Sequence, residues 1–151
     1  NFPYNISSQI VFKIIEHREL IFEMVGMFQK EMAVRIAAKP NSKDYGVIGI
    51  LAQAFYDCEY LFDVPPGCFT PPPKVMSGIL RMKRKTEPLG CDEKLFRQIV
   101  KQAFTQRRKM MSNSLKSFAF EGDVWDAFAS KRPEQLSVQE FVVLTNILSN
   151  G

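Results

Sequence analysis

The stretch from Phe55 to Lys83, FYDCEYLFDVPPGCFTPPPKVMSGILRMK, decides the fold of this chain. Residues 55–64 are rich in aromatic side chains, which favour a strand. The prolines and glycine of 65–67 predict a turn, and the proline run that follows predicts a stiff, extended loop over 69–75. Residues 75–83 alternate in polarity and predict a second strand. Two strands joined by one such loop are expected to pair antiparallel.

The chain before this stretch alternates between helix and strand. Two serines, Ser7 and Ser8, can cap a helix that runs to about residue 16, with apolar residues on one face. Residues 24–29 form a short apolar run, which predicts a buried strand. Two more helices are predicted over 30–39 and 44–54, on either side of a break at proline.

The chain after this stretch is helical. Pro88 and Gly90 mark the boundary that we expect between residues 1–88 and a second domain over 89–151. An apolar stripe predicts a helix over 91–106. Further helices are predicted over 109–118, 124–129 and, capped by Ser137, 137–148. The sequence therefore predicts an α/β part followed by an all-α part.

The tetrapeptide Asn1-Phe2-Pro3-Tyr4 carries a chemical signal, because it has the form that methyltransferases use on exocyclic amino groups. The lone pair of an aromatic amine is delocalised into its ring, so the nitrogen is a poor nucleophile. The Asn1 side chain and the carbonyl of Phe2 or Pro3 can accept hydrogen bonds from such an amine and turn its lone pair toward an incoming methyl group. Proline holds these acceptors in place, and the ring of Tyr4 can stack on an extruded base.

A cofactor pocket is missing from the sequence. In Rossmann-like folds such a pocket begins with a strand, a glycine-rich turn and a helix. The eight glycines of this chain are scattered, and no Gly-x-Gly occurs. We therefore expect this chain to be the second half of a larger enzyme and to be inactive alone.

Positive charge is concentrated in two windows. The formal net charge is only +4, yet residues 74–85 and 97–116 hold more than half of the 20 Lys and Arg residues and no acidic residue. Such windows form either solvated surface or an electrostatic footprint for the phosphates of RNA.

Other residue types exclude several classes of protein. The three cysteines lie far apart without C-x-x-C spacing, and we expect reduced thiols in a cytoplasmic protein. The single histidine, His17, lies in a polar stretch, so no histidine-based triad or zinc site can be built and no metal is expected. No apolar run is long enough to span a bilayer, and no membrane partner is expected.

Three segments resemble motifs of the rRNA adenine N6-dimethyltransferases and follow one another in that family's order. Residues 1–8 (NFPYNISS) resemble its motif IV, and residues 69–77 (FTPPPKVMS) resemble its Phe-x-Pro-x-Pro-Lys-Val-x-Ser loop. Residues 103–115 (AFTQRRKMMSNSL) resemble the signature of the helical C-terminal domain in small-subunit rRNA dimethyltransferases of the KsgA type. The resemblance covers essentially the whole chain. Phe2 departs from the commoner Leu or Ile, an exchange between apolar residues.

The resemblance implies a fold and an activity. The fold would be the second half of a Rossmann-like class I methyltransferase sheet, with an antiparallel final hairpin, followed by a small helical RNA-binding domain. The activity would be methyl transfer from S-adenosylmethionine to N6 of two adjacent adenines near the 3′ end of small-subunit rRNA, in ribosome biogenesis. The enzyme would be a monomer acting on a pre-30S-type ribosomal particle.

The resemblance and the chemistry above also imply roles for individual residues. Asn1, Pro3 and Tyr4 would be catalytic, and Asn1 would contact the cofactor. The residues that contact the target base would be Phe2, through its carbonyl, and Tyr4 and Phe69, through their rings. The phosphates of RNA would be held by Lys74, Arg107, Arg108 and Lys109.

Alternatives stay open on the sequence alone. One is a related methyltransferase that acts on large-subunit rRNA or is related to mitochondrial transcription factors, although the 107–115 signature argues against it. Another is a non-catalytic RNA-binding or ribosome-assembly module. A DNA adenine methyltransferase would share the first motif, but we would not expect it to carry the 69–77 loop and the helical tail. Lys74 could be an ordinary surface lysine, and the basic residues 107–109 could pack against acids of the sheet domain.

Overall fold

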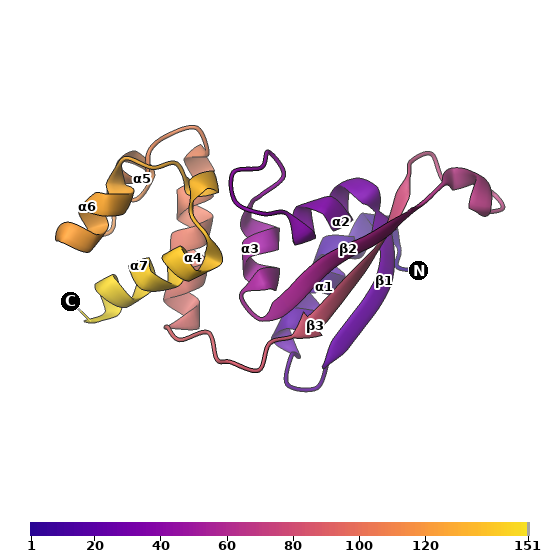
Figure 1. The fold of residues 1–151 in the computed structure, drawn as a ribbon, viewed down its shortest axis with the longest axis horizontal. Helices are drawn as coiled ribbons and strands as arrows, with labels where there is room; N and C mark the ends of the chain where they lie inside the picture. Colours follow the sequence, from indigo (N-terminus) through magenta and orange to yellow (C-terminus); the bar gives the residue numbers. More distant parts are fainter. Residues whose placement is uncertain (151) are drawn as a thin grey trace.

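Strand β3 (Ser77–Arg84) is the central strand of a three-stranded sheet in the computed structural model, which describes residues 1–150. It pairs antiparallel with β1 (Glu23–Gln29) on one side and with β2 (Tyr56–Val64) on the other (Figure 1). The pairing of β2 with β3 confirms the predicted antiparallel hairpin.

The two faces of the sheet differ in polarity. Met24 lies opposite Met82 on the inner face, and both side chains are buried. On the outer face Glu23 lies opposite Lys83, and both are exposed. This alternation is the two-residue period of strands that bury one face only.

Three helices complete the sheet unit, which we define as residues 1–84. Helix α2 (Lys30–Ala37) packs against all three strands, α3 (Val47–Gln53) packs against β2, and α1 (Ser7–Glu16) packs against α3. The core between these elements consists of large side chains that are almost completely inaccessible to solvent, among them Ile15, Phe28, Ile36, Ile50, Tyr56, Leu80 and Met82. Truncating such a side chain to alanine typically costs about 2–5 kcal/mol of folding free energy.

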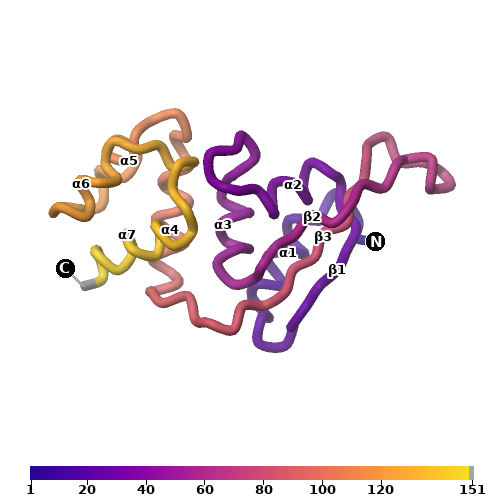
Figure 2. The backbone as a smooth tube through the Cα atoms, viewed as in Figure 1, coloured from indigo at the N-terminus to yellow at the C-terminus, as the bar shows by residue number. Residues whose placement is uncertain are grey.

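The loop between β2 and β3 projects from the body of the molecule, and the N-terminus lies toward the same end (Figure 2). It contains the short 3-10 helix η2 (Pro66–Cys68) and a cis peptide bond between Thr70 and Pro71. Proline-rich backbone lacks amide donors, so this loop continues neither strand.

The helical unit, residues 93–150, follows a connector over 85–92. Its helices are α4 (Glu93–Ala103), η3 (Phe104–Gln106), α5 (Met111–Ser114), α6 (Asp123–Ala129), η4 (Pro133–Gln135) and α7 (Val138–Asn150). The fold is therefore the predicted α/β part, with its antiparallel hairpin, followed by an all-α part. Within residues 1–150, every helix lacks either the length or the apolar character of a membrane span.

Helix caps agree only in part with the sequence analysis. Ser137 caps α7 as predicted, since its hydroxyl accepts from the Glu140 amide at 3.1 Å and the Glu140 carboxylate accepts from the Ser137 amide at 2.9 Å. The prediction that Ser7 caps α1 is wrong. Ser7 lies inside the first turn and donates to the carbonyls of Pro3 and Tyr4, because the 3-10 turn η1 (Tyr4–Ile6) leads directly into the helix.

Element boundaries also differ from the predictions, and three of these differences matter here. The helix predicted over 109–118 is reduced to Met111–Ser114, because the Met111 amide donates to the carbonyl of Lys131 at 2.7 Å and the backbone of Met110 is extended. Helix α3 begins at Val47 rather than at residue 44, after a turn. Strand β3 begins at Ser77 rather than at residue 75. For the helix predicted over 109–118, a tertiary contact overrides local helix propensity.

The three cysteines are free thiols. Cys68 is exposed in the projecting loop, whereas Cys58 is half-buried in β2. Burial raises the pKa of the Cys58 thiol to about 12, so this side chain is protonated at neutral pH and is a poor nucleophile.

Candidate active site

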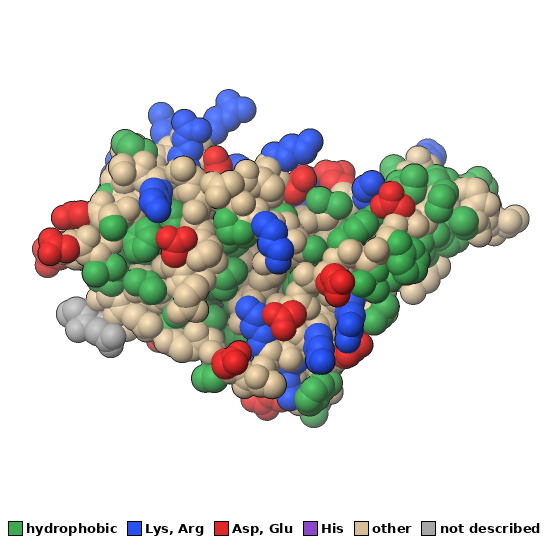
Figure 3. All heavy atoms as spheres, viewed as in Figure 1, with side chains coloured by type: hydrophobic (Ala, Val, Ile, Leu, Met, Phe, Trp, Pro, Cys, Tyr) green, Lys and Arg blue, Asp and Glu red, His purple; other side chains and the backbone are tan. Residues whose placement is uncertain are grey.

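A cavity of about 480 Å³ brings together the first residues of the chain and the projecting loop. It is lined by Asn1, Phe2, Tyr4, Asn5, Met27, Phe69, Pro71, Pro72 and Pro73. Figure 3 shows hydrophobic side chains gathered over the hairpin that forms one side of this region. The structure thus unites Asn1, Tyr4 and Phe69, which the sequence analysis assigned to one site although they lie far apart in the chain.

The ring of Phe2 anchors the first motif to the sheet. It packs against the ring of Phe28, with 5.1 Å between centroids, and lies over Gly26, where any Cβ would overlap it. The Phe2 amide also donates to the carbonyl of Met27 at 3.4 Å. The Phe2 ring therefore lies against β1, and its backbone is the part best placed to interact with a base.

The structure distinguishes the two carbonyl acceptors that the sequence left open. The carbonyl of Pro3 already accepts from the Ser7 hydroxyl at 3.1 Å and from the Ile6 amide at 3.4 Å. The carbonyl of Phe2 accepts no hydrogen bond from the rest of residues 1–150. The free acceptor pair is therefore the exposed side chain of Asn1 and the carbonyl of Phe2.

Tyr4 and Phe69 approach the cavity from different elements. Tyr4 begins the turn η1, and its hydroxyl forms a hydrogen bond with the hydroxyl of Ser77. Phe69 follows η2 in the projecting loop, and both rings are half-buried. Asn5 and Met27 also line the cavity but were not predicted. Asn5 follows the recognised tetrapeptide directly, whereas Met27 carries no signal that separates it from other apolar strand residues.

The predicted phosphate-binding residues do not form one cluster. Lys74 is exposed in the projecting loop and does not line the cavity. Arg108 and Lys109 are exposed on the helical unit, whereas Arg107 turns inward. A second depression, of about 470 Å³, is lined by Arg107 and Arg108 together with Asn41, Ser42, Lys43, Arg132 and Glu134. Lys43 and Arg132 lie outside the acid-free windows, so composition did not indicate them.

Arg107 fastens the helical unit to the sheet unit. Its guanidinium group donates to the carbonyls of Tyr45 at 2.8 Å and Ser42 at 3.1 Å, and pairs with Glu134 at 3.2 Å. These contacts engage the guanidinium group within the chain, and we infer that Arg107 has a structural role. Arg107 does contact the sheet unit, but through backbone carbonyls, and its acidic partner Glu134 belongs to the helical unit.

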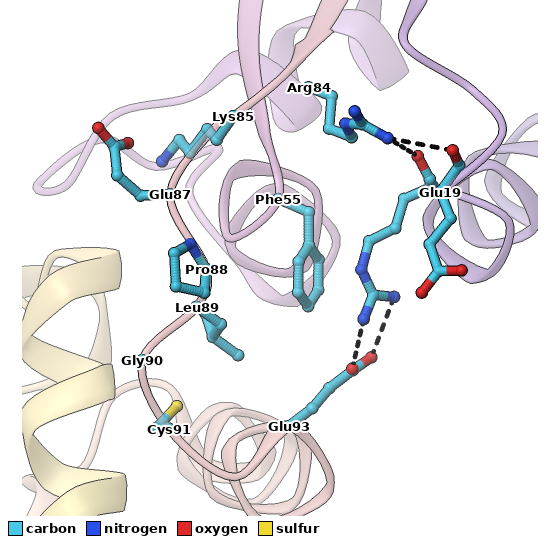
Figure 4. Close-up of a pocket in the computed structure, with 11 residues that line it drawn as sticks. Glu19, Phe55, Arg84, Lys85, Glu87, Pro88, Leu89, Gly90, Cys91 and Glu93 are labelled. Atoms are coloured by element: carbon cyan, nitrogen blue, oxygen red, sulfur yellow. Dashed lines mark hydrogen bonds and ion pairs between the residues drawn. The ribbon is translucent and has the colours of Figure 1, made fainter.

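A second arginine joins the two units beside the connector. Arg18 pairs with Glu93 of α4 at 2.7 Å and lies over the ring of Phe55 at 4.1 Å from its centroid. Arg84 in turn donates to the carbonyls of Arg18 and Glu19. These side chains border a cavity of about 380 Å³ between β3, the connector and α4 (Figure 4). No sequence pattern indicated this contact, because the two partners lie far apart along the chain.

The end of β2 beside the loop carries a small polar network. Tyr60 forms a hydrogen bond with Asp63, which also pairs with Lys30 at 3.2 Å. The hydrogen bond from Tyr60 and the nearby Lys30 lower the pKa of the Asp63 carboxyl. Burial, and then the hydrogen bond to Asp63, raise the pKa of Tyr60 to about 12. The network links the end of β2 beside the loop to α2.

Comparison with known proteins defines the class of protein. Residues 1–148 match the model of the family described as ribosomal RNA adenine dimethylase. The chain therefore belongs to the ribosomal RNA adenine dimethylase family.

Individual relatives carry more specific names. The chain is 56% identical over 151 residues to a protein of Cytophaga hutchinsonii named ribosomal RNA small subunit methyltransferase A. It is 58% identical over 147 residues to the protein of that name from Flavobacterium johnsoniae. These matches cover 99% and 96% of this chain but only 58% and 56% of the relatives, so the chain spans a little over half of their length.

Two solved structures share the fold. A dimethyladenosine transferase from Plasmodium falciparum superposes with a TM-score of 0.81 at 26% identity, covering 95% of this chain and 63% of that one. The 23S rRNA methyltransferase ErmE superposes with a TM-score of 0.68 at 24% identity, covering 96% of this chain and 63% of that one, and this likeness concerns the fold alone.

Substituting Gly26 by alanine tests the anchoring of Phe2. We expect Gly26→Ala to displace the Phe2 ring and to lower stability by about 1–3 kcal/mol, as overpacking does. Thermal unfolding measures this change. Gly67→Ala is the matched control, because no atom lies within 4 Å of a Cβ at Gly67. Equal melting temperatures for the two variants would contradict the anchoring role of Gly26.

Separate substitutions within residues 107–109 test whether Arg107 stabilises the fold while Arg108 and Lys109 bind RNA. We expect Arg107→Gln to lower stability by about 1–3 kcal/mol, because the carbonyls of Ser42 and Tyr45 lose a charged donor. Arg108→Gln with Lys109→Gln should leave the melting temperature unchanged. In the full-length protein it should flatten the plot of log rRNA affinity against log salt by about 1.4–1.8 units. Filter binding across salt concentrations and thermal melting give the two readouts, and the reverse pattern would contradict the assignment.

Proposed function

We propose that the protein carrying this chain is a monomeric cytoplasmic enzyme of ribosome biogenesis. It transfers methyl groups from S-adenosylmethionine to N6 of two adjacent adenines near the 3′ end of small-subunit rRNA, in a pre-30S-type particle. The cavity that unites Asn1, Tyr4 and Phe69, in a chain of this family, carries the proposal. The names of the relatives that match at 56% and 58% identity support the small subunit as the substrate.

The free acceptors account for activation of the amine. In this mechanism Asn1 and the carbonyl of Phe2 accept hydrogen bonds from the two N6 hydrogens of the adenine. Their pull turns the nitrogen toward tetrahedral geometry and aims its lone pair away from the ring. Pro3 supports the arrangement from the next position, since its fixed backbone angle and its own bonded carbonyl hold the turn. The nitrogen becomes cationic and acidic on attack and loses its proton to solvent water, so no general base is needed.

The aromatic side chains account for binding of the base. An adenine extruded from its stack would lie on Tyr4, with Phe69 closing the opposite face. The cavity, at about 480 Å³, is within the range of about 300–1,000 Å³ typical of small-molecule sites. Phe2 contributes its carbonyl and, through its anchored ring, the position of the motif.

The cofactor fits this chain only at one point. S-adenosylmethionine would supply the methyl group when bound, and Asn1 is the residue of this chain that we propose would contact it. The backbone around the cavity offers no glycine-rich turn to approach a nucleotide. We propose that residues outside 1–151 hold most of the cofactor.

An exposed apolar groove suggests where that part of the protein packs. The groove runs along α1 and the turn after it, and its apolar lining residues are Ile6, Ile10, Ile14, Leu20 and Ile21. Leu20 is 85% exposed. An exposed apolar patch of this kind often marks a surface that another part of the protein covers. We propose that the cofactor-binding part covers this groove.

The remaining basic residues are proposed to hold RNA. Lys74 beside the cavity, and Arg108 and Lys109 on the helical unit, are exposed and free of ion pairs within residues 1–150. Contacts to phosphate position the substrate without reading its sequence.

The division of the cofactor site predicts that this chain alone does not bind S-adenosylmethionine. Titration calorimetry of residues 1–151 with the cofactor is expected to show no heat of binding at micromolar concentrations. The full-length protein is the positive control. Micromolar binding to the isolated chain would contradict the proposal.

The decisive test of the function is methyl transfer by the full-length protein to small-subunit and large-subunit rRNA. Methylation of adenine N6 in the small-subunit RNA is expected. Asn1→Ala should reduce the rate about 10²–10³-fold, because one preorganised acceptor is lost, while rRNA affinity stays within about twofold. Gln98→Ala, which removes an exposed carboxamide on α4, is the control. Methylation of large-subunit rRNA instead, or an unchanged rate for Asn1→Ala, would contradict the proposal.

A further inference from the structure

Ser77 occupies the point where the two ladders of the sheet end. It lies opposite Gln29 of β1 and Val64 of β2, and no part of it is accessible to solvent. It is also the first strand residue after the projecting loop. A serine hydroxyl at a fully buried strand position is costly unless it is hydrogen-bonded, so its partner is informative.

That partner is the hydroxyl of Tyr4. The bond spans 73 positions of sequence and is the only side-chain hydrogen bond of the Tyr4 hydroxyl within the described residues. The Tyr4 backbone is fixed separately, since its carbonyl accepts from the Ser7 hydroxyl at 3.2 Å. Backbone contacts leave the side-chain torsions of a tyrosine free, so the bond to Ser77 sets the orientation of the ring.

We propose that Ser77 is a positioning residue for the target base. By holding the Tyr4 hydroxyl, it fixes the plane of the ring on which the base stacks. Because Ser77 directly follows the loop that carries Phe69, the same contact couples the two aromatic walls of the cavity. This inference rests on the proposed function, and it adds a residue that acts on the base only through Tyr4.

Two single variants and their combination test the coupling in the full-length protein. Ser77→Ala and Tyr4→Phe remove opposite ends of the same hydrogen bond, and Tyr4→Phe keeps the stacking ring. Single-turnover methylation of small-subunit rRNA gives the rate, and filter binding gives the affinity for rRNA. Each single variant is expected to lower the rate about fivefold to tenfold and to leave affinity within about twofold. The double variant should be no slower than either single variant within about twofold.

Two controls separate positioning from general stability. Ser77→Thr keeps a hydroxyl on a residue that favours strands, and its rate should stay within about twofold of the unaltered protein. Thr145→Val removes a different buried hydroxyl, one that donates to the carbonyl of Phe141 in α7, and should leave the rate unchanged.

Several results would overturn the inference. They are a double variant slowed by the product of the single effects, an unaltered rate for Ser77→Ala, and a loss of rRNA affinity that matches the loss of rate. If Ser77→Ala does not fold, Tyr4→Phe decides, and an unaltered rate for it overturns the inference. Failure of the proposed function is distinguishable, because the unaltered protein would then not methylate small-subunit rRNA at all, and the role of Ser77 would fail with it.

Discussion

The antiparallel pairing of β3 with both of its neighbours is the constraint on which the site depends. Because β3 runs against β1 and β2, its first residue, Ser77, lies beside the last residues of both strands. The loop that precedes β3 must therefore begin and end at the same end of the sheet, where β1 and β2 finish. The first motif of the chain is fixed to the same region through Phe2 and Gly26, so the two halves of the cavity meet there.

Anchoring and function are separated within the first motif. The ring of Phe2 and the carbonyl of Pro3 are held by contacts within residues 1–150. The side chain of Asn1 and the carbonyl of Phe2 form no hydrogen bond within those residues. Such a division holds the backbone that carries the Phe2 carbonyl in place before any substrate arrives. Preorganised acceptors lose little entropy on binding, which is the usual physical source of their effect on a reacting group.

Two guanidinium groups fasten the helical unit to the sheet unit. Arg18 contacts Glu93 at the start of α4, beside the connector. Arg107, which follows the other end of that helix, contacts the carbonyls of Ser42 and Tyr45. A planar guanidinium group suits this role because it directs several donors in fixed directions. Because the contacts of Arg18 and Arg107 lie apart, they hold the exposed Arg108 at a defined position relative to the cavity in the sheet unit.

The sequence by itself determined the class of fold, the hairpin, and the membership of Asn1, Tyr4 and Phe69 in one site, because these follow from local periodicity and from recognisable motifs. It did not determine which carbonyl is free, that Arg107 points inward, or that the 109–118 helix is cut short. Only the three-dimensional structure decided these. The free carbonyl follows from the geometry of the turn before α1, in which Ser7 and Ile6 occupy the carbonyl of Pro3. The other two depend on partners distant in the chain, Tyr45 for Arg107 and Lys131 for the shortened helix. Local pattern specifies what an element can be, whereas the orientation of a long side chain is set by the partners that packing brings to it.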